Sequence, residues 1–277
     1  MPHIKSNGID LYYEETGTGI PLIFVHEFAG DYRSWEAQVR FFSRRYRCIT
    51  YSARGYFPSE VPEVSDAYSQ DNAILDLLGL MDGLGLEKAH VCGLSMGSYT
   101  TVLFGLNHPG RARSLTIAGS GYGSGPARKE FHTQMGQLAD QMLAEGMAAN
   151  ATHYTESDTR LQLRAKDPRG YQEFVTHFLE HSAVGSAYTL KGVQGQRPDI
   201  TQLGDKLKTL HVPAMVMLGD EDVPGFDGSL FMKRTIPGAG FELFPRSGHA
   251  INLEEPQRFN RSLLEFLTLV DSGRWKA

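Results

Sequence analysis

The chain has 277 residues, of which 41% are hydrophobic and 21% are charged. This length and composition are typical of a globular protein with one sizeable domain, into which a subdomain can be inserted. The formal net charge of −5 excludes a broadly basic surface, so we expect neither nucleic acid nor an anionic membrane as a partner. The N-terminal residues lack the apolar stretch of a signal peptide, and no run is long enough for a transmembrane helix.

Cysteine usage points to a reducing compartment. The two cysteines, Cys48 and Cys92, both lie in apolar, strand-like runs. Buried free thiols fit this pattern better than a disulfide does. We therefore expect a cytoplasmic protein. A homodimer is compatible with the sequence and has no specific support in it.

The first quarter of the chain predicts four elements. Residues 3–15 alternate around Asn7-Gly8, a two-residue turn signal, and indicate an antiparallel hairpin. Residues 21–26 form a continuous apolar run, which is typical of a strand covered on both faces. Ser34 can cap a helix that continues to Phe42, and residues 48–51 indicate the next buried strand.

The centre of the chain carries the most informative motif. A helix expected from about 66 to 84 is followed by an apolar strand over 89–94, which leads into Gly93-Leu94-Ser95-Met96-Gly97 and a further helix. A serine at the tip of a sharp strand-to-helix turn has a strained backbone, and the flanking glycines leave room for that turn. The backbone N–H of Met96 then points to where an oxyanion would form. The motif predicts that Ser95 is a nucleophile.

The second half of the chain divides into a helical block and a return of strands. After a strand at 113–118, residues 126–201 lose strand-like runs, and the spacing predicts helices over 128–147, 158–166, 170–180 and 186–193. Strands return at 214–218 and 240–244, and Pro256 opens an amphipathic helix. We predict a mostly parallel α/β sheet covered by helices, built from residues 1–125 and 202–277, with residues 126–201 as an inserted helical lid.

A serine nucleophile needs a base, and the base needs an anion to orient it. In a parallel sheet these groups come from loops at the carboxyl ends of strands. Asp220, Asp222 and Asp227 follow the strand at 214–218, and His249 follows the strand at 240–244. The order serine, aspartate, histidine therefore places one candidate of each kind just beyond a strand.

These stretches together resemble the α/β-hydrolase fold of the serine hydrolases. The resemblance extends from the first strands to the last helix, outside the expected lid, and rests on residues 24–26, 54–59, 93–97, 219–222 and 248–256. It implies a catalytic triad of Ser95, Asp222 and His249, because the acid of the family lies in a Gly-x-x-Asp turn and its histidine in a Gly-His pair. It also implies an oxyanion hole formed by the backbone N–H groups of Phe28 and Met96.

Glu27 departs from the pattern of this family. The family usually has His-Gly and an apolar residue where this chain has His26-Glu27-Phe28. One interpretation points Glu27 away from the site, in a salt bridge with Arg33, Arg54 or another base. The other places its carboxylate in the pocket, where it binds a cationic or hydrogen-donating group of the substrate.

No metal or cofactor is implied by the sequence. No cluster of His, Cys and Asp has the spacing of a zinc site, and Gly17-x-Gly19 lacks the strand–helix context of a nucleotide loop. The histidines of the expected lid, His132, His153, His177 and His181, are candidates for the pocket wall. Its apolar residues are further candidates, although we expect most of them to pack the lid onto the core: Phe131, Met135, Met142, Phe174, Phe178 and Tyr188.

The leading hypothesis is hydrolysis of a carboxylic ester, lactone or amide of a small, fairly apolar substrate through an acyl-enzyme. An esterase is favoured because activated esters demand least of the leaving group. A second hypothesis is a carbon–carbon bond hydrolase of diketone-like ring-cleavage products, or a cofactor-free perhydrolase or oxygenase, on the same triad. A third is a slow ligand sensor that acts by lid movement. The fold alone does not choose among them.

Overall fold

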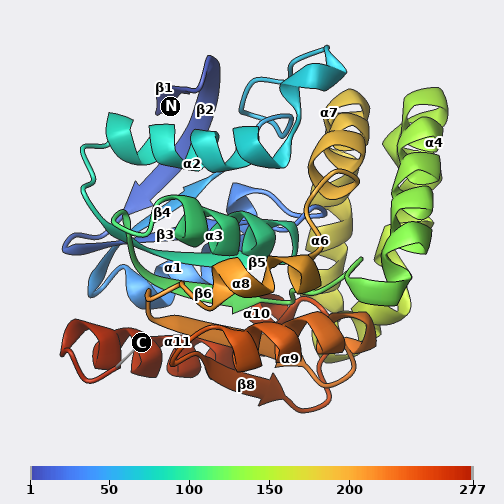
Figure 1. The fold of residues 1–277 in the computed structure, drawn as a ribbon. Coiled ribbons are helices and arrows are strands. Elements are labelled where there is room, and N and C mark those ends of the chain that lie inside the picture. Colours follow the sequence, from blue (N-terminus) through green and yellow to red (C-terminus); the bar gives the residue numbers. More distant parts are fainter. Residues whose placement is uncertain (1, 276–277) are drawn as a thin grey trace.

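The computed structural model describes residues 2–275, without the side chains of Asn150 and His153. These residues form an eight-stranded sheet (Figure 1) with the order β1-β2-β4-β3-β5-β6-β7-β8. The strands are β1 His3–Ser6, β2 Ile9–Thr16, β3 Ile20–Val25, β4 Tyr46–Tyr51, β5 Ala89–Leu94, β6 Ala112–Ala118, β7 Ala214–Gly219 and β8 Gly240–Phe244.

The sheet is mostly parallel, as the sequence predicts. β1 and β2 form the expected hairpin, in which Asn7 and Gly8 both have a positive φ, of 44° and 81°. β2 also pairs antiparallel with β4, whereas the pairs from β4 through β3, β5, β6 and β7 to β8 are parallel. The carboxyl ends of β3, β5, β7 and β8 therefore lie on one edge of the sheet, which brings their loops together.

Helices cover both faces of the sheet, so each face has its own apolar core. One core includes residues from α2 (Gln70–Gly83), α3 (Met96–Asn107), α8 (Gly204–Leu207) and α9 (Phe226–Thr235). The opposite core includes residues from α1 (Glu36–Phe42), α10 (Ile251–Glu254) and α11 (Pro256–Asp271). Burial on both faces explains why the central strands read as continuous apolar runs rather than as alternating ones.

The segment between β6 and β7 is helical, and its longer helices lie together beyond one end of the sheet (Figure 1). It contains α4 Arg128–Thr155, α5 Leu161–Lys166, α6 Pro168–Leu179 and α7 Ala183–Tyr188, with short turns η3 Gly125–Ala127, η4 Asp158–Arg160, η5 Thr189–Gln194 and η6 Ile200–Leu203. A third apolar cluster joins this segment to the loops above the sheet, through residues such as Phe28 and Met96.

Several element boundaries differ from the sequence prediction. The helix expected from about residue 66 begins at Gln70, because Ser69 accepts a hydrogen bond from Asn72 N and caps it. Asp31, not Ser34, accepts the hydrogen bond from a backbone N–H that begins the short helical turn Tyr32–Trp35. α4 continues past residue 147 to Thr155, across a kink at Gly146. α9 was not predicted, since its short sequence has little apolar periodicity.

The prediction that both cysteines are buried free thiols is confirmed. Cys48 and Cys92 are buried free thiols, and burial raises the pKa of Cys48 to about 12. Neither thiol is therefore a ready nucleophile at neutral pH. Within residues 2–275, every helix is too short or too polar to cross a lipid bilayer.

Candidate active site

Ser95 lies at the strained turn that the motif predicts. It sits between β5 and α3 with φ of 54° and ψ of −113°, a conformation that side chains other than glycine rarely adopt. The turn is held by two hydrogen bonds: Ser95 N donates to Ala118 O at 2.8 Å, and Ser98 Oγ donates to Ser95 O at 2.5 Å. These two hydrogen bonds thus hold the strained backbone of Ser95 in place.

The two glycines of the motif allow close packing that a Cβ atom would prevent. A Cβ on Gly93 would lie 2.2 Å from Gly97 O, inside the turn itself. A Cβ on Gly97 would lie 2.2 Å from Val25 O and 2.7 Å from His26 O. Gly97 therefore lets the first turn of α3 rest directly on the end of β3, which places Met96 beside the loop that follows β3.

His249 and Asp222 form a buried pair. His249 Nδ1 lies 2.9 Å from Asp222 Oδ2, and both side chains are buried. Burial would raise the pKa of Asp222, but the charge of His249 and hydrogen bonds from His249 and Tyr122 hold it below its ordinary value. The alternatives are placed elsewhere: Asp220 accepts a hydrogen bond from Ser247 N, and Asp227 is exposed.

Tyr122 is a member of this cluster that the sequence analysis missed. Its hydroxyl donates to the second carboxylate oxygen, Asp222 Oδ1, and its ring lies edge-on to the His249 ring at 4.9 Å. Tyr122 belongs to the glycine-rich stretch after β6, where the sequence indicated a loop and gave no sign of which side chain turns inward. The only available signal was a single aromatic residue among the glycines of residues 119–125.

The loop that carries His249 is fixed from two sides. Glu254 of α10 accepts hydrogen bonds from Gly248 N at 2.6 Å and Ala250 N at 3.0 Å, on either side of the histidine. His249 N itself donates to Thr159 O at 3.2 Å. Because Thr159 belongs to the helical segment between β6 and β7, that segment takes part in placing His249.

The two expected oxyanion donors, Phe28 and Met96, lie next to Ser95. Met96 is the first residue of α3, so its N–H has no acceptor within the helix. Phe28 follows Glu27 in the loop after β3, and its N–H has no hydrogen-bond acceptor among the described residues. Close packing at Gly97 holds these two segments against each other. Neither N–H group therefore has an acceptor among the described residues that would compete with a negatively charged oxygen.

Glu27 forms a buried ion pair with Arg160. Arg160 Nη1 donates to Glu27 Oε1 at 3.0 Å and Nη2 to Glu27 Oε2, and the two residues are 3% and 2% exposed. Burial would raise the pKa of Glu27, but Arg160 and His249 lower it below its ordinary value. The partner of Glu27 is therefore Arg160 of η4. Arg33 and Arg54, the partners that the sequence suggested, pair with other carboxylates. Sequence reasoning missed Arg160, which belongs to a segment distant in the chain.

Ser95, His249 and Glu27 share one cavity of about 190 Å³. Its wall mixes apolar and polar groups: Phe28, Tyr122, Phe131, Gln134, Met135, Tyr154, Ser157, Thr159, Arg160 and Gln194. Two of the apolar residues expected to line a pocket, Phe131 and Met135, do so. His132, His177 and His181 are not among the lining residues, and the side chain of His153 lies outside the described residues.

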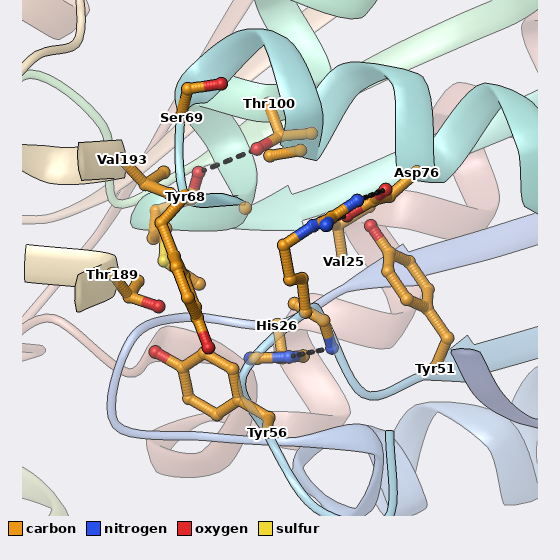
Figure 2. Close-up of a pocket in the computed structure, with 15 residues that line it drawn as sticks. Val25, His26, Tyr51, Tyr56, Tyr68, Ser69, Asp76, Thr100, Thr189 and Val193 are labelled. Carbon is orange, nitrogen blue, oxygen red and sulfur yellow. Dashed lines mark hydrogen bonds and ion pairs between the residues drawn. The ribbon is translucent and has the colours of Figure 1, made fainter. Parts of the chain in front are cut away.

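A smaller cavity of about 30 Å³ is lined by His26 (Figure 2) and Met96, the chain neighbours of Glu27 and Ser95. His26 borders it and bonds two backbone groups: Ala53 N donates to His26 Nε2 at 2.9 Å, and His26 Nδ1 lies 2.7 Å from Glu27 O. Burial lowers the pKa of His26 to about 4, so the ring is neutral at pH 7. His26 therefore links the loop after β3 to the chain just beyond β4.

The comparisons with known proteins agree with this geometry. Residues 20–256 match the model of the alpha/beta hydrolase fold family. The 2-hydroxy-6-oxononadienedioate/2-hydroxy-6-oxononatrienedioate hydrolase of Burkholderia vietnamiensis is 28% identical over 96% of this chain and 94% of its own length. The 3-oxoadipate enol-lactonase 1 of Acinetobacter baylyi is 27% identical over 86% of this chain and 85% of its own.

A solved structure extends the likeness to three dimensions. The thermophilic esterase of Thermogutta terrifontis superposes with a TM-score of 0.86 at 28% identity, covering 97% of this chain and 98% of that one. The family match spans far more than half of the 277 residues. This protein belongs to the alpha/beta hydrolase fold family and is a hydrolase of that fold.

Proposed function

We propose that the protein is a serine hydrolase that cleaves a carboxylic ester, lactone or amide of a small substrate, with Ser95, His249 and Asp222 as its triad. One observation carries the proposal: Ser95, at a strained positive-φ turn, shares a cavity with a histidine whose Nδ1 is held by a buried aspartate. A serine hydroxyl needs this environment to become a nucleophile. The helical segment of residues 126–201 acts as the lid over this cavity.

The geometry supports a two-step mechanism. Ser95 Oγ attacks the carbonyl carbon while His249 Nε2 accepts its proton, and Asp222 holds the ring through Nδ1. The N–H groups of Phe28 and Met96 bind the oxyanion of the tetrahedral intermediate. His249 then protonates the leaving group, which departs and leaves an acyl group on Ser95. Water, deprotonated by His249, releases the acid and restores the serine.

The cavity suits a small substrate with a polar part. Its volume of about 190 Å³ leaves little room for a long acyl chain, and its wall includes Glu27, Arg160, Gln134 and Gln194 beside the aromatic residues. We propose that Glu27 helps to bind the substrate as a member of the Glu27–Arg160 pair. Since Arg160 already neutralises the carboxylate, a hydrogen-donating group is a better fit for Glu27 than a full positive charge.

A carbon–carbon bond hydrolase is the second candidate. The relative from Burkholderia vietnamiensis is named for a hydrolase of this kind, and the alignment covers almost the whole of both chains. Such a reaction would use the same triad and oxyanion donors on a diketone-like substrate. A cofactor-free perhydrolase that uses the same triad belongs with this second candidate.

The test is a time course with p-nitrophenyl esters of increasing chain length, run on the wild type, Ser95→Ala and Glu27→Gln. We expect turnover of the short esters in the wild type, its loss in Ser95→Ala, and a raised KM in Glu27→Gln. KM is measured on folded protein, because the loss of the buried partner of Arg160 should also lower the thermal midpoint of Glu27→Gln. Vinylogous diketones form the second substrate set. Turnover of diketones alone would favour the carbon–carbon reaction, and ester turnover that survives in Ser95→Ala would refute the triad.

A further inference from the structure

Two arginines are buried beside the Ser95 cavity, and only one of them has a carboxylate partner. Arg160 pairs with Glu27. Arg197, which follows η5 near the end of the lid, is 2% exposed and takes part in none of the ion pairs among the described residues. A buried cation without a counter-ion is costly and rarely kept without a compensating interaction.

Aromatic rings supply part of that compensation. The Arg197 guanidinium lies 3.8 Å from the centroid of the Tyr99 ring and 4.8 Å from that of Phe131. Tyr99 is one helical turn after Ser95, and Phe131 lines the Ser95 cavity. The stacked rings leave the donating edges of the guanidinium free for hydrogen bonds.

Only some of the guanidinium N–H groups of Arg197 have a hydrogen-bond acceptor among the described residues. Arg197 Nη2 donates to Tyr122 O at 2.6 Å, and Nη1 makes a long contact of 3.4 Å with Gln194 Oε1. Nε is buried and has no acceptor within the part of the chain that the structure describes. Tyr122 and Gln194 both line the Ser95 cavity, so the guanidinium lies directly behind that part of the wall.

Two more basic side chains lie near Arg197, and each has a buried nitrogen without an acceptor among the described residues. Arg128 donates through Nη2 to Arg197 O, while its buried Nη1 has no acceptor among the described residues. The buried Nε2 of His132 also has none. Burial and the charges of Arg128 and Arg197 lower the pKa of His132. Asp199 is close enough to Arg128 to feel its charge, but its oxygens accept hydrogen bonds from Thr201 and Gly125 instead.

We propose that Arg197, with Arg128 and His132 beside it, forms an anion subsite that binds a carboxylate on the acyl part of the substrate. A carboxylate that displaces the long Gln194 contact would accept a hydrogen bond from Arg197 Nη1 and neutralise the buried charge. The substrate is then the monoester or lactone of a short dicarboxylic acid. This inference rests on the proposed ester hydrolysis and adds the substrate class to it.

The test compares matched methyl esters that differ in one terminal group. Monomethyl succinate, glutarate and adipate are each paired with the neutral methyl ester of the same chain length, and acid release is followed in a pH-stat. We expect the wild type to prefer the acidic ester at one chain length by at least tenfold in kcat/KM. Arg197→Met should reduce that preference at least tenfold, and Arg197→Lys should restore part of it.

The matched control is Arg258→Met, which removes another arginine stacked on an aromatic ring, Phe244 at 5.0 Å, and neither residue lines the Ser95 cavity. It should keep the full preference for the acidic ester. If Arg197→Met does not fold, Arg128→Met, on a half-buried residue, takes its place. A wild type that shows no preference at any chain length, or a folded Arg197→Met that keeps it, overturns the subsite.

A binding measurement separates this inference from the proposed function. Calorimetry with free glutarate and adipate should show binding to the wild type and at least tenfold weaker binding to Arg197→Met. If no ester is turned over but the diacid binds through Arg197, the proposed reaction fails and the anion subsite stands. If neutral esters are hydrolysed but no diacid binds, the reaction stands and the subsite fails.

Discussion

The loop after β3 and the start of α3 separate two cavities that resemble each other in chemistry and differ in organisation. Neighbouring residues alternate between them: His26 and Met96 border the small cavity, whereas Glu27 and Ser95 line the large one. Each cavity has one buried arginine–carboxylate pair. Arg54 and Asp76 form it on the small side, and Arg160 and Glu27 form it on the large side.

The difference lies in what each pair connects. Arg54 follows β4 and Asp76 belongs to α2, so their pair joins two parts of the α/β core (Figure 2). Arg160 comes from η4, between β6 and β7, and Glu27 from the loop after β3, so their pair joins the helical segment to the core beside Ser95. The small cavity holds about 30 Å³ and the large one about 190 Å³. One buried ion pair thus joins two parts of the core, whereas the other forms part of the wall of the Ser95 cavity.

The strongest way to test this contrast is to remove the charge of Asp222 on the large side. Asp222→Asn should lower kcat about 10⁴-fold, because an amide no longer holds the His249 ring in the productive tautomer. The protein should remain folded by circular dichroism. Asp220→Asn is the matched control and should change kcat by less than about tenfold, since Asp220 bonds only the Ser247 backbone here. Equal losses in the two variants would contradict the assignment.

On the small side, the same kind of change should affect stability instead. Asp76→Ala leaves the Arg54 guanidinium, 9% exposed, without its partner and should lower the free energy of unfolding by about 3–5 kcal/mol. Urea denaturation measures this loss, and kcat per folded molecule should stay within a few-fold. Asp82→Ala on the same helix removes a surface pair with Arg111 and should have little effect. A large kcat loss in folded Asp76→Ala would contradict the prediction that the Arg54–Asp76 pair affects stability and not catalysis.

The pH dependence of stability tests the support beneath the loop. The pKa of His26 is about 4 in the native state and about 6.5 in the unfolded chain, so unfolding takes up a proton between these values. Its contribution is complete above pH 6.5 and falls by about 3 kcal/mol as the pH drops to 4. His26→Gln should lose that part of the pH dependence in urea titrations. Parallel curves for the variant and the wild type would show that His26 is not buried neutral.

The smallest expected effect concerns Tyr122, a positioning residue that acts through Asp222. Tyr122→Phe removes the hydroxyl donor to Asp222 Oδ1 and keeps the ring beside His249. We expect kcat to fall about tenfold, the size of one lost hydrogen bond to a charged group. The pKa of Asp222 should rise, and because the acid limb of the kcat/KM profile reports the coupled Asp222–His249 pair, that limb should move to higher pH. A lower thermal midpoint with an unchanged profile would reduce Tyr122 to a packing role.

The sequence predicted the core far better than the lid contacts. The strands stand out as apolar runs, and the motif around Ser95 fixes a turn whose geometry has few solutions. His249 and Asp222 follow strands, so their meeting at one edge could be anticipated. Arg160 and Arg197 could not, because helical periodicity shows which face is apolar but not which loop of the core that face covers. Tyr122 lies in a glycine-rich loop, which has no helical or strand-like periodicity to indicate which side chain points inward.

The most direct measurement of the central claim is the site of covalent modification by a p-nitrophenyl alkylphosphonate. Such a reagent reacts with an activated serine and stops at a stable analogue of the acyl-enzyme. Peptide mass spectrometry of the wild type should place one adduct on Ser95, and Ser95→Ala and Asp222→Asn should form it far more slowly or not at all. An adduct on another residue, or equal labelling of Ser95→Ala, would contradict the assignment of Ser95 as the nucleophile.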